Sequence, residues 1–250
     1  PQGTTILGAA KLSGKLGRNL SLVALSALTN RESARLAGPG GRFEAVVEPR
    51  TSYNLLRVRQ EIAGGRQSIG LLATGTFRDL EPRLRPEMNS DAETVGLDGW
   101  SFLDQGKMWV LTGWTGASRV SGSQERITAL QQNPVHYFQR PDAGHVDVDS
   151  SRTSLTGVLA GINHSKLAGA LRWDIDYVGE RPKLELNDMG ALGSADDRGL
   201  FWDIYYRHTK PGPALHSWTS GFFQGNEWNF DGNRKFTELG LRPGREIEEI

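Results

Sequence analysis

"YNLLRVRQEIAGGRQSIGLLATGTFRD", residues 53–79, carries the main clue to the architecture of this chain. Its two halves flank the pair Gly64 and Gly65, which is typical of the tight turn of a β-hairpin. The first half alternates uncharged with charged residues, in the order Leu56, Arg57, Val58, Arg59, Gln60 and Glu61. Because successive side chains of a strand point to opposite faces, one face is charged and the other is largely apolar. The apolar face can meet either a buried protein core or lipid.

Alternation of this kind recurs along the chain, whereas helical periodicity is nearly absent. The alternating segments are bounded by Gly, Asn, Asp and Pro, and each is about as long as a tilted strand needs to cross a bilayer. They predict ten strands, at residues 4–16, 20–30, 52–63, 67–79, 93–103, 107–121, 153–164, 168–179, 198–209 and 215–230.

The connections between these strands alternate strictly between short and long. The short ones are "KLGRN", "GGRQ", "DQGK", "HSKL" and "KPGPA", and the long ones are 31–51, 80–92, 122–152 and 180–197. All short turns then lie at one end of the sheet, as in outer-membrane barrels, although a soluble meander can have the same order by chance. The sequence therefore predicts an all-β, antiparallel up-and-down meander of about ten strands, part of a transmembrane β-barrel.

One segment looks helical. "SQERITALQQN", residues 123–133, begins with Ser123 as a possible N-cap and is followed by Pro134, which stops a helix. It lies in the longest connection, so we expect it to form part of a lid or plug outside the membrane.

Composition restricts the function classes. The chain has 250 residues, and its 29 Lys and Arg balance its 29 Asp and Glu, which gives no reason to expect a nucleic-acid partner. It has no cysteine, which excludes a disulfide framework. The opening "PQGTTILGAA" lacks the basic and apolar regions of a signal peptide, so we expect an intracellular protein, a mature chain or a fragment.

Aromatic residues gather near the ends of the predicted strands. Tyr and Trp prefer the headgroup layer of a membrane, where an amphipathic ring finds both of its environments. Packing in a protein core is the alternative. The predicted interface aromatics are Tyr53, Phe77, Trp109, Trp173, Tyr177, Trp202, Trp218 and Trp228.

Charged residues within the strands predict a polar lumen that holds water, selects solutes or seats a plug. Mutual neutralisation of these charges is the structural alternative. The lumen candidates are Arg57, Arg59, Glu61, Arg78, Arg119, Arg172, Asp174, Asp176, Asp203 and Arg207.

Catalytic and metal-binding motifs are absent from the sequence, and the five histidines have no metal-ligand spacing. His145, Asp147 and Asp149 lie on one side of an extended loop and could bind Ca²⁺, but the loop lacks the Gly and Glu of an EF-hand. A carboxylate pair for glycoside hydrolysis could come from Asp174, Asp176, Glu185 and Asp188. We expect no enzymatic activity, no cofactor and no metal.

Five segments carry a family resemblance: "TTILGAAKLSGKLGRNLSLVALSALT", "VEPRTSYNLLRVRQEIAGGRQSIGLLAT", "ASRVSGSQERITALQQNPVHYFQRPDA", "SSRTSLTG" and "LELNDMGAL". In this order they resemble the C-terminal barrel region of the DUF5916 family of bacterial envelope proteins, over about residues 3–232. Residues 138–143 and 185–190 are the most specific parts. The resemblance implies a secreted protein with an N-terminal family 9 carbohydrate-binding-like domain and a barrel of more than ten strands.

We therefore expect a barrel segment over 1–232, incomplete by itself, and a divergent or disordered tail over 233–250. The expected location is the outer membrane of a Gram-negative bacterium, and the expected partners are membrane lipid, a carbohydrate or other small solute, and the remaining parts of the same parent protein. The expected function is non-enzymatic solute binding or passage through a polar lumen gated by 122–152. The alternatives are a soluble all-β carbohydrate-binding module and a β-rich glycoside hydrolase.

Overall fold

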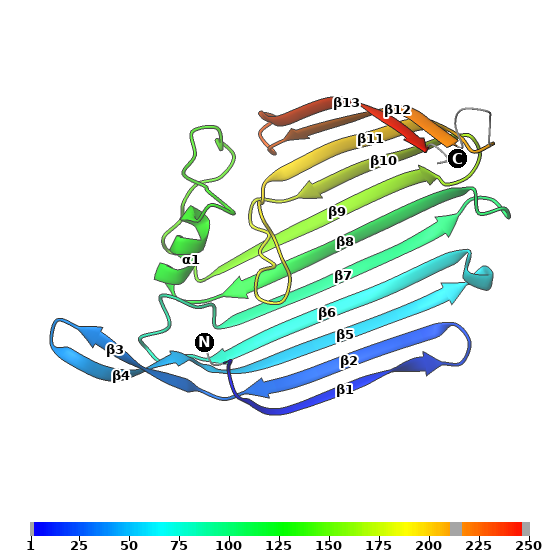
Figure 1. Cartoon of the computed structure of the whole chain (residues 1–250). Coiled ribbons are helices and arrows are strands. Elements are labelled where there is room, and N and C mark those ends of the chain that lie inside the picture. The colour runs from blue at the N-terminus through cyan, green and yellow to red at the C-terminus, as the bar shows by residue number, and fades with distance from the viewer. Residues whose placement is uncertain (1–2, 211–216, 247–250) are drawn as a thin grey trace.

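A computed structural model describes residues 3–210 and 217–246, and Figure 1 shows that most of them form one large curved sheet. The sheet has eleven strands in the order β1-β2-β5-β6-β7-β8-β9-β10-β11-β12-β13, and β3 and β4 form a separate two-stranded sheet. Each strand of the large sheet pairs antiparallel with its neighbours in this order. The predicted all-β antiparallel meander is confirmed.

The strands of the large sheet are β1 (Ile6–Leu16), β2 (Leu20–Thr29), β5 (Arg50–Ile62), β6 (Gln67–Asp79), β7 (Asp91–Phe102), β8 (Trp109–Ser121), β9 (Ser154–Lys166), β10 (Leu171–Glu180), β11 (Asp197–His208), β12 (Ser217–Trp228) and β13 (Arg234–Glu246). The small sheet consists of β3 (Glu32–Gly38) and β4 (Gly41–Glu48). The helical elements are the 3₁₀ turn η1 (Ala63–Gly65) and the helix α1 (Gln124–Gln132).

All ten predicted strands are present, with small shifts at their ends. Of the two alternatives expected for the tail, divergent or disordered, disorder does not hold for Arg234–Glu246, because this segment pairs along its length with β12. Pro243 cannot donate a main-chain hydrogen bond, but a strand at the edge of a sheet tolerates proline. The long connection 31–51 also differs from a plain loop, since it contains the β3–β4 hairpin.

The predicted short and long connections lie at opposite ends of the sheet (Figure 1). The β12–β13 connection, 229–233, was not predicted; it is short but lies at the end of the long connections. The turn of the β5–β6 hairpin needs its glycines, since Gly64 and Gly65 have φ angles of 67° and 79°. Four of the five short turns lie in the described part of the chain, while residues 211–214 of "KPGPA" lie outside it. The predicted hairpin around Gly64 and Gly65 is confirmed, with pairs that run from Arg50↔Asp79 to Ile62↔Gln67.

The two faces of the sheet differ in chemistry. Directly paired residues share a face, so the register assigns every side chain to one of two faces, which we call the apolar face and the polar face. The apolar face carries exposed large hydrophobic side chains on each strand of the sheet, including Leu12, Leu28, Leu56, Ile69, Leu97, Leu111, Ile162, Ile175, Leu200, Phe222 and Leu239. Such an extended exposed apolar surface indicates contact with lipid or with another protein.

The densest core lies between the polar face and the long connections. We call residues 80–90, 122–153 and 181–196 the loop cap. Ile127 and Leu130 of α1 pack with Ala92, Val120 and Leu155 of the sheet. A second cluster forms around Leu184, Leu192 and Ala195. The loop cap therefore covers the polar face at its long-connection end.

The predicted helix is confirmed within this cap. The Ser123 Oγ accepts a hydrogen bond from the Arg126 main-chain nitrogen at 3.2 Å, which satisfies one of the free N–H groups at the start of α1. No helix in residues 3–210 or 217–246 is long and apolar enough to span a membrane.

Candidate functional site

The predicted lumen residues share the polar face, with one exception. The register pairs Arg119 with Glu93 and Thr156, on the same face as Val95 and Val158. The prediction for Arg119 is therefore wrong, because strand position alone does not fix the face; the register does. The others occupy the polar face: Arg57, Arg59, Glu61, Arg78, Arg172, Asp174, Asp176, Asp203 and Arg207.

A compact ion cluster lies on the polar face of β5 and β7. The Arg57 Nη2 donates to the Asp98 Oδ1 at 2.7 Å, and the Arg57 Nη1 forms an ion pair with the other carboxylate oxygen. The Arg59 Nη2 lies 3.7 Å from the same carboxylate, and the Arg59 guanidinium lies 5.2 Å from the centre of the Trp100 ring. A Cβ atom at Gly70 would lie 2.8 Å from the Arg57 guanidinium, so glycine leaves room for this pair against the sheet.

Carboxylates dominate the polar face of the later strands. The Asn163 Nδ2 donates to Asp174 at 2.6 Å and to Asp176 at 2.9 Å, and the Ser165 Oγ donates to Asp174 at 2.6 Å. These bonds hold the two aspartates side by side. They border a cavity of about 170 Å³ whose lining includes Asp174, Asp176, Phe201, Asp203, Phe223 and Glu238.

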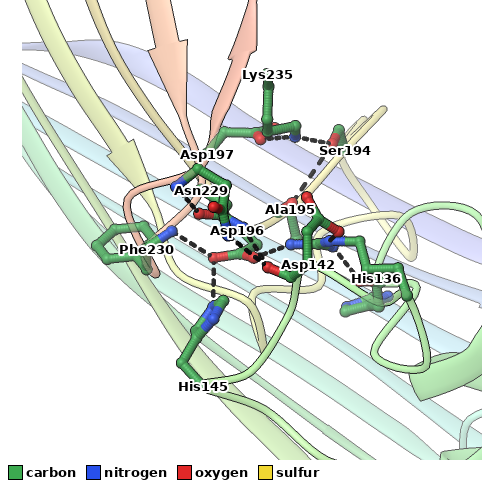
Figure 2. Close-up of polar contacts among 12 residues, drawn as sticks. His136, Asp142, His145, Ser194, Ala195, Asp196, Asp197, Asn229, Phe230 and Lys235 are labelled. Atoms are coloured by element: carbon green, nitrogen blue, oxygen red, sulfur yellow. Dashed lines mark hydrogen bonds and ion pairs between the residues drawn. The ribbon is translucent and has the colours of Figure 1, made fainter.

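The loop cap is held together by a buried carboxylate. Asp196 is fully buried and forms an ion pair with Arg140, and its Oδ1 lies 2.9 Å from the His145 Nε2. The Phe230 main-chain nitrogen donates to the same Oδ1 at 3.0 Å. Figure 2 shows Asp196 at the centre of this network, between His145 and Phe230. Asp196 thus joins 136–145, 194–197 and 229–230, which are far apart in the sequence.

A second set of contacts joins the cap to the sheet. Arg78 of β6 forms an ion pair with Asp188, and the Asn89 Nδ2 donates to the Asp188 Oδ2 at 2.8 Å. The Arg126 Nε donates to the Asn89 Oδ1 at 2.9 Å. Burial lowers the pKa of Arg126, and the nearby carboxylates of Asp188 and Glu185 oppose this shift. These contacts attach α1 and 185–190 to β6.

His136 lies inside the cap and is fully buried. Its Nε2 lies 2.9 Å from the Leu184 carbonyl oxygen and 3.9 Å from the Glu185 Oε2. Burial lowers the pKa of His136, and the Glu185 charge acts in the opposite direction. The segments 138–143 and 185–190, which carry the most specific family resemblance, therefore lie in one packed unit.

Gly157→Ala tests the close packing of the loop cap against β9. A Cβ atom at position 157 would lie 2.1 Å from the Leu184 main-chain nitrogen, so 183–185 must move away from β9. We expect the change to cost about 1–3 kcal/mol of cap stability, in the range of core overpacking. Limited proteolysis of residues 122–153 in the folded protein measures this loss. Gly193→Ala is the matched control, because a Cβ there meets nothing within 4 Å, and equal sensitivity of the two variants would contradict the packing.

The proposed carboxylate set for hydrolysis is not brought together as a whole. Asp174 and Asp176 are neighbours on β10, whereas Glu185 lies beside His136 and Asp188 beside Arg78. Of the loop considered for Ca²⁺, His145 contacts Asp196 and Asp149 contacts Arg152. In the described residues, no group of three or more His, Asp or Glu could hold a metal ion.

The predicted interface aromatics lie on the apolar face, except Tyr53. Tyr53 pairs with Ala27 and Thr76, which places it on the polar face, so its assignment to a lipid interface is wrong. The others occupy the apolar face at three levels of the sheet: Trp109, Trp173 and Trp218 near the short turns, Trp202 near the middle, and Phe77, Tyr177 and Trp228 near the long connections.

The aromatic groups near the short turns form clusters. The Trp109 and Trp173 ring centres lie 4.9 Å apart, and the Lys166 Nζ lies 5.2 and 5.3 Å from the two rings. Trp218 packs with Tyr206 and His208, at ring distances of 5.4 and 5.7 Å. Aromatic rings beside cationic side chains at one level of an apolar surface are typical of a membrane interface.

Several residues of the site were not predicted from the sequence. Asp98 is the partner of Arg57, and Trp100 and Trp114 lie on the polar face, unlike the other tryptophans. Counting alternation within 91–102 and 109–121 could have found all three. Asp196, Arg140 and His136 carry no local signal, because their partners lie in distant loops.

Taken together, the fold and the site define a class: a single antiparallel sheet that separates an apolar surface from a polar one, with a loop cap closing one end of the polar side. Within this class, the chain belongs to the DUF5916 family. The family model, described as "Domain of unknown function (DUF5916)", matches residues 1–242 and so includes most of β13. The predicted family is confirmed.

Among solved structures, the chain is similar to the outer membrane channel DcaP of Acinetobacter baumannii. The two are 14% identical with a TM-score of 0.48, and the match covers 93% of this chain and 60% of the channel. No match was found among curated proteins.

Proposed function

We propose that this chain is the membrane-spanning part of an outer-membrane β-barrel. A small solute binds in the polar interior of this barrel or passes through it. The observation that carries the proposal is the pair of unlike faces. One face exposes large apolar side chains on every strand, and the opposite face carries the ion cluster, the carboxylates and the loop cap. Lipid outside and water inside a barrel require this division.

The dimensions of the sheet fit the same proposal. Its strands have 10 to 13 residues, close to the length that a tilted strand needs to cross the hydrocarbon layer. The edge strands β1 and β13 each leave one side free in the strand order. Since open edges are not tolerated in lipid, we propose that further strands of the parent protein pair with them and close the barrel.

The loop cap then acts as a gate or plug. It covers the polar face at the long-connection end and is attached through Asp188 and Asp196. Solutes would enter past the cap and meet first the cavity beneath residues 186–190 and then the ion cluster around Asp98. The proposed location of the protein is the outer membrane of a Gram-negative bacterium.

Planar-bilayer recording of the full-length protein that contains this chain tests the proposal. We expect detergent-dependent solubility, heat-modifiable migration on a gel and discrete conductance steps after reconstitution. A protein that stays monomeric and soluble without detergent, or that gives no conductance after verified insertion, would refute passage through its interior.

A further inference from the structure

Trp114 lies flat against the polar face of the sheet. A Cβ atom at Gly161, its direct partner on β9, would lie 2.2 Å from the indole ring. Glycine at this position therefore lets one face of the ring rest on the β9 backbone. Trp114 also lines the cavity that Leu186 and Met189 border, so we infer that the opposite face of the ring is a flat aromatic platform for that cavity.

The same packing of an aromatic ring over a glycine recurs on later strands of the polar face. A Cβ atom at Gly199 would lie 2.3 Å from the Phe201 ring, and one at Gly240 would lie 2.2 Å from the Phe223 ring. Both phenylalanines line the cavity that Asp174 and Asp176 border. The rings of Trp114 on β8, Phe201 on β11 and Phe223 on β12 thus each pack over a glycine of the sheet.

The cavity beside Trp114 has a volume of about 260 Å³. Its floor includes Gly96 and Gly116, which have no side chains, and Leu186 and Met189 of the loop cap line it as well. Polar side chains are few: those of Thr74, Thr94 and Asp98 lie on the polar face, whereas the Thr115 side chain lies on the apolar face and donates to the Leu159 carbonyl oxygen. The cavity thus joins the cap, the platform and the ion cluster.

The charge of this cavity discriminates between ligand classes. Asp98 is the charged residue in its lining, and Arg57 neutralises that carboxylate through two contacts. Arg59 also approaches this carboxylate, at 3.7 Å, but it does not line the cavity. An ion entering the cavity would therefore lose hydration without meeting an unpaired opposite charge in the lining. A neutral ligand with hydroxyl groups can instead donate to the carboxylate, accept from the guanidinium and bond to the threonines.

We propose that this cavity binds one ring of a neutral saccharide, with Trp114 stacked against the apolar face of the sugar and the Asp98–Arg57 pair bonded to its hydroxyls. Phe201 and Phe223 then offer further stacking positions along the polar face. The proposal rests on the proposed function, since it makes the polar interior the path of the solute, and it narrows that solute to carbohydrates.

Two measurements on the full-length protein test this proposal. The first is calorimetric titration of the detergent-solubilised protein with neutral trisaccharides built from glucose, xylose or N-acetylglucosamine. The second is interruption of single-channel current by the same sugars. We expect binding of at least one trisaccharide, and we expect Trp114→Leu to weaken it about tenfold or more, as the loss of an aromatic stacking contact would.

Gly161→Ala is the second variant, since its methyl group displaces the indole while the tryptophan itself remains. It should weaken sugar binding as Trp114→Leu does. Trp202→Leu is the matched control on the apolar face and should leave binding unchanged. Absence of binding by every trisaccharide, or equal loss in Trp202→Leu, would overturn the proposal even if conductance is normal. Sugar binding that depends on Trp114 in a protein without conductance would support the saccharide site and reject passage.

Discussion

Val58→Arg and Leu97→Arg should each destabilise the membrane-inserted protein by about 2–4 kcal/mol, the cost of an arginine facing lipid near the bilayer midplane. Both side chains lie on the apolar face, and Leu97 is 48% exposed near the middle of β7. In water, an arginine at such an exposed position would change stability by no more than about 0.5 kcal/mol. Urea titration of the protein refolded into lipid vesicles measures the difference.

Arg59→Gln is the matched control on the same strand. Arg59 lies next to Val58 on β5 but on the polar face, where it makes one long ion contact of 3.7 Å. Its loss should change stability much less than Val58→Arg does. Equal tolerance of Val58→Arg and Arg59→Gln would show that the apolar face does not meet lipid, and would reject the proposed barrel.

Asp196→Asn should destabilise the loop cap by about 3–5 kcal/mol, because it leaves the Arg140 charge without its buried partner. Asparagine keeps the shape of the side chain and tolerates the φ angle of 65° at this position, so backbone strain does not explain the loss. It can also still accept from the Phe230 main-chain nitrogen. Hydrogen exchange of residues 136–145 and 194–197 in the folded protein measures the destabilisation.

Asp142→Asn is the control for this prediction. Asp142 also contacts Arg140, at 3.1 Å, but its side chain is 49% exposed. An ion pair in contact with water contributes about 0–1 kcal/mol, so exchange should change little. If Asp142→Asn opened the cap as far as Asp196→Asn, the buried carboxylate would not be the group that holds it.

The meander was predictable because its signals are local. Alternation within each strand and glycines in each turn act over a few residues, and pairs such as Arg57↔Leu72 follow once the Gly64 and Gly65 turn is placed. β13 was missed because its sequence, "RKFTELGLRPGRE", contains glycines and a proline that weaken the strand pattern. Pairing with β12 supplies the main-chain partners that the local pattern does not indicate.

The site was less predictable than the fold. Arg119 and Tyr53 were assigned to the wrong face because a charge or a ring near a strand end does not define the register. The ion pair between Arg140 and Asp196 joins residues 56 positions apart in two irregular loops. No periodicity relates such residues, so only the folded arrangement brings them together.

The meander also implies an order of folding. Each strand pairs with the next strand of the large sheet along the chain, so the hairpins with short turns can form first and then add to one another across the long connections. The cap is different, since Arg78 and Asp188 are 110 residues apart and meet only after β6 to β10 stand in register. Closure of the loop cap would then be a late folding step that requires a correctly assembled sheet. A register error in the hairpins between β6 and β10 would leave the loop cap open.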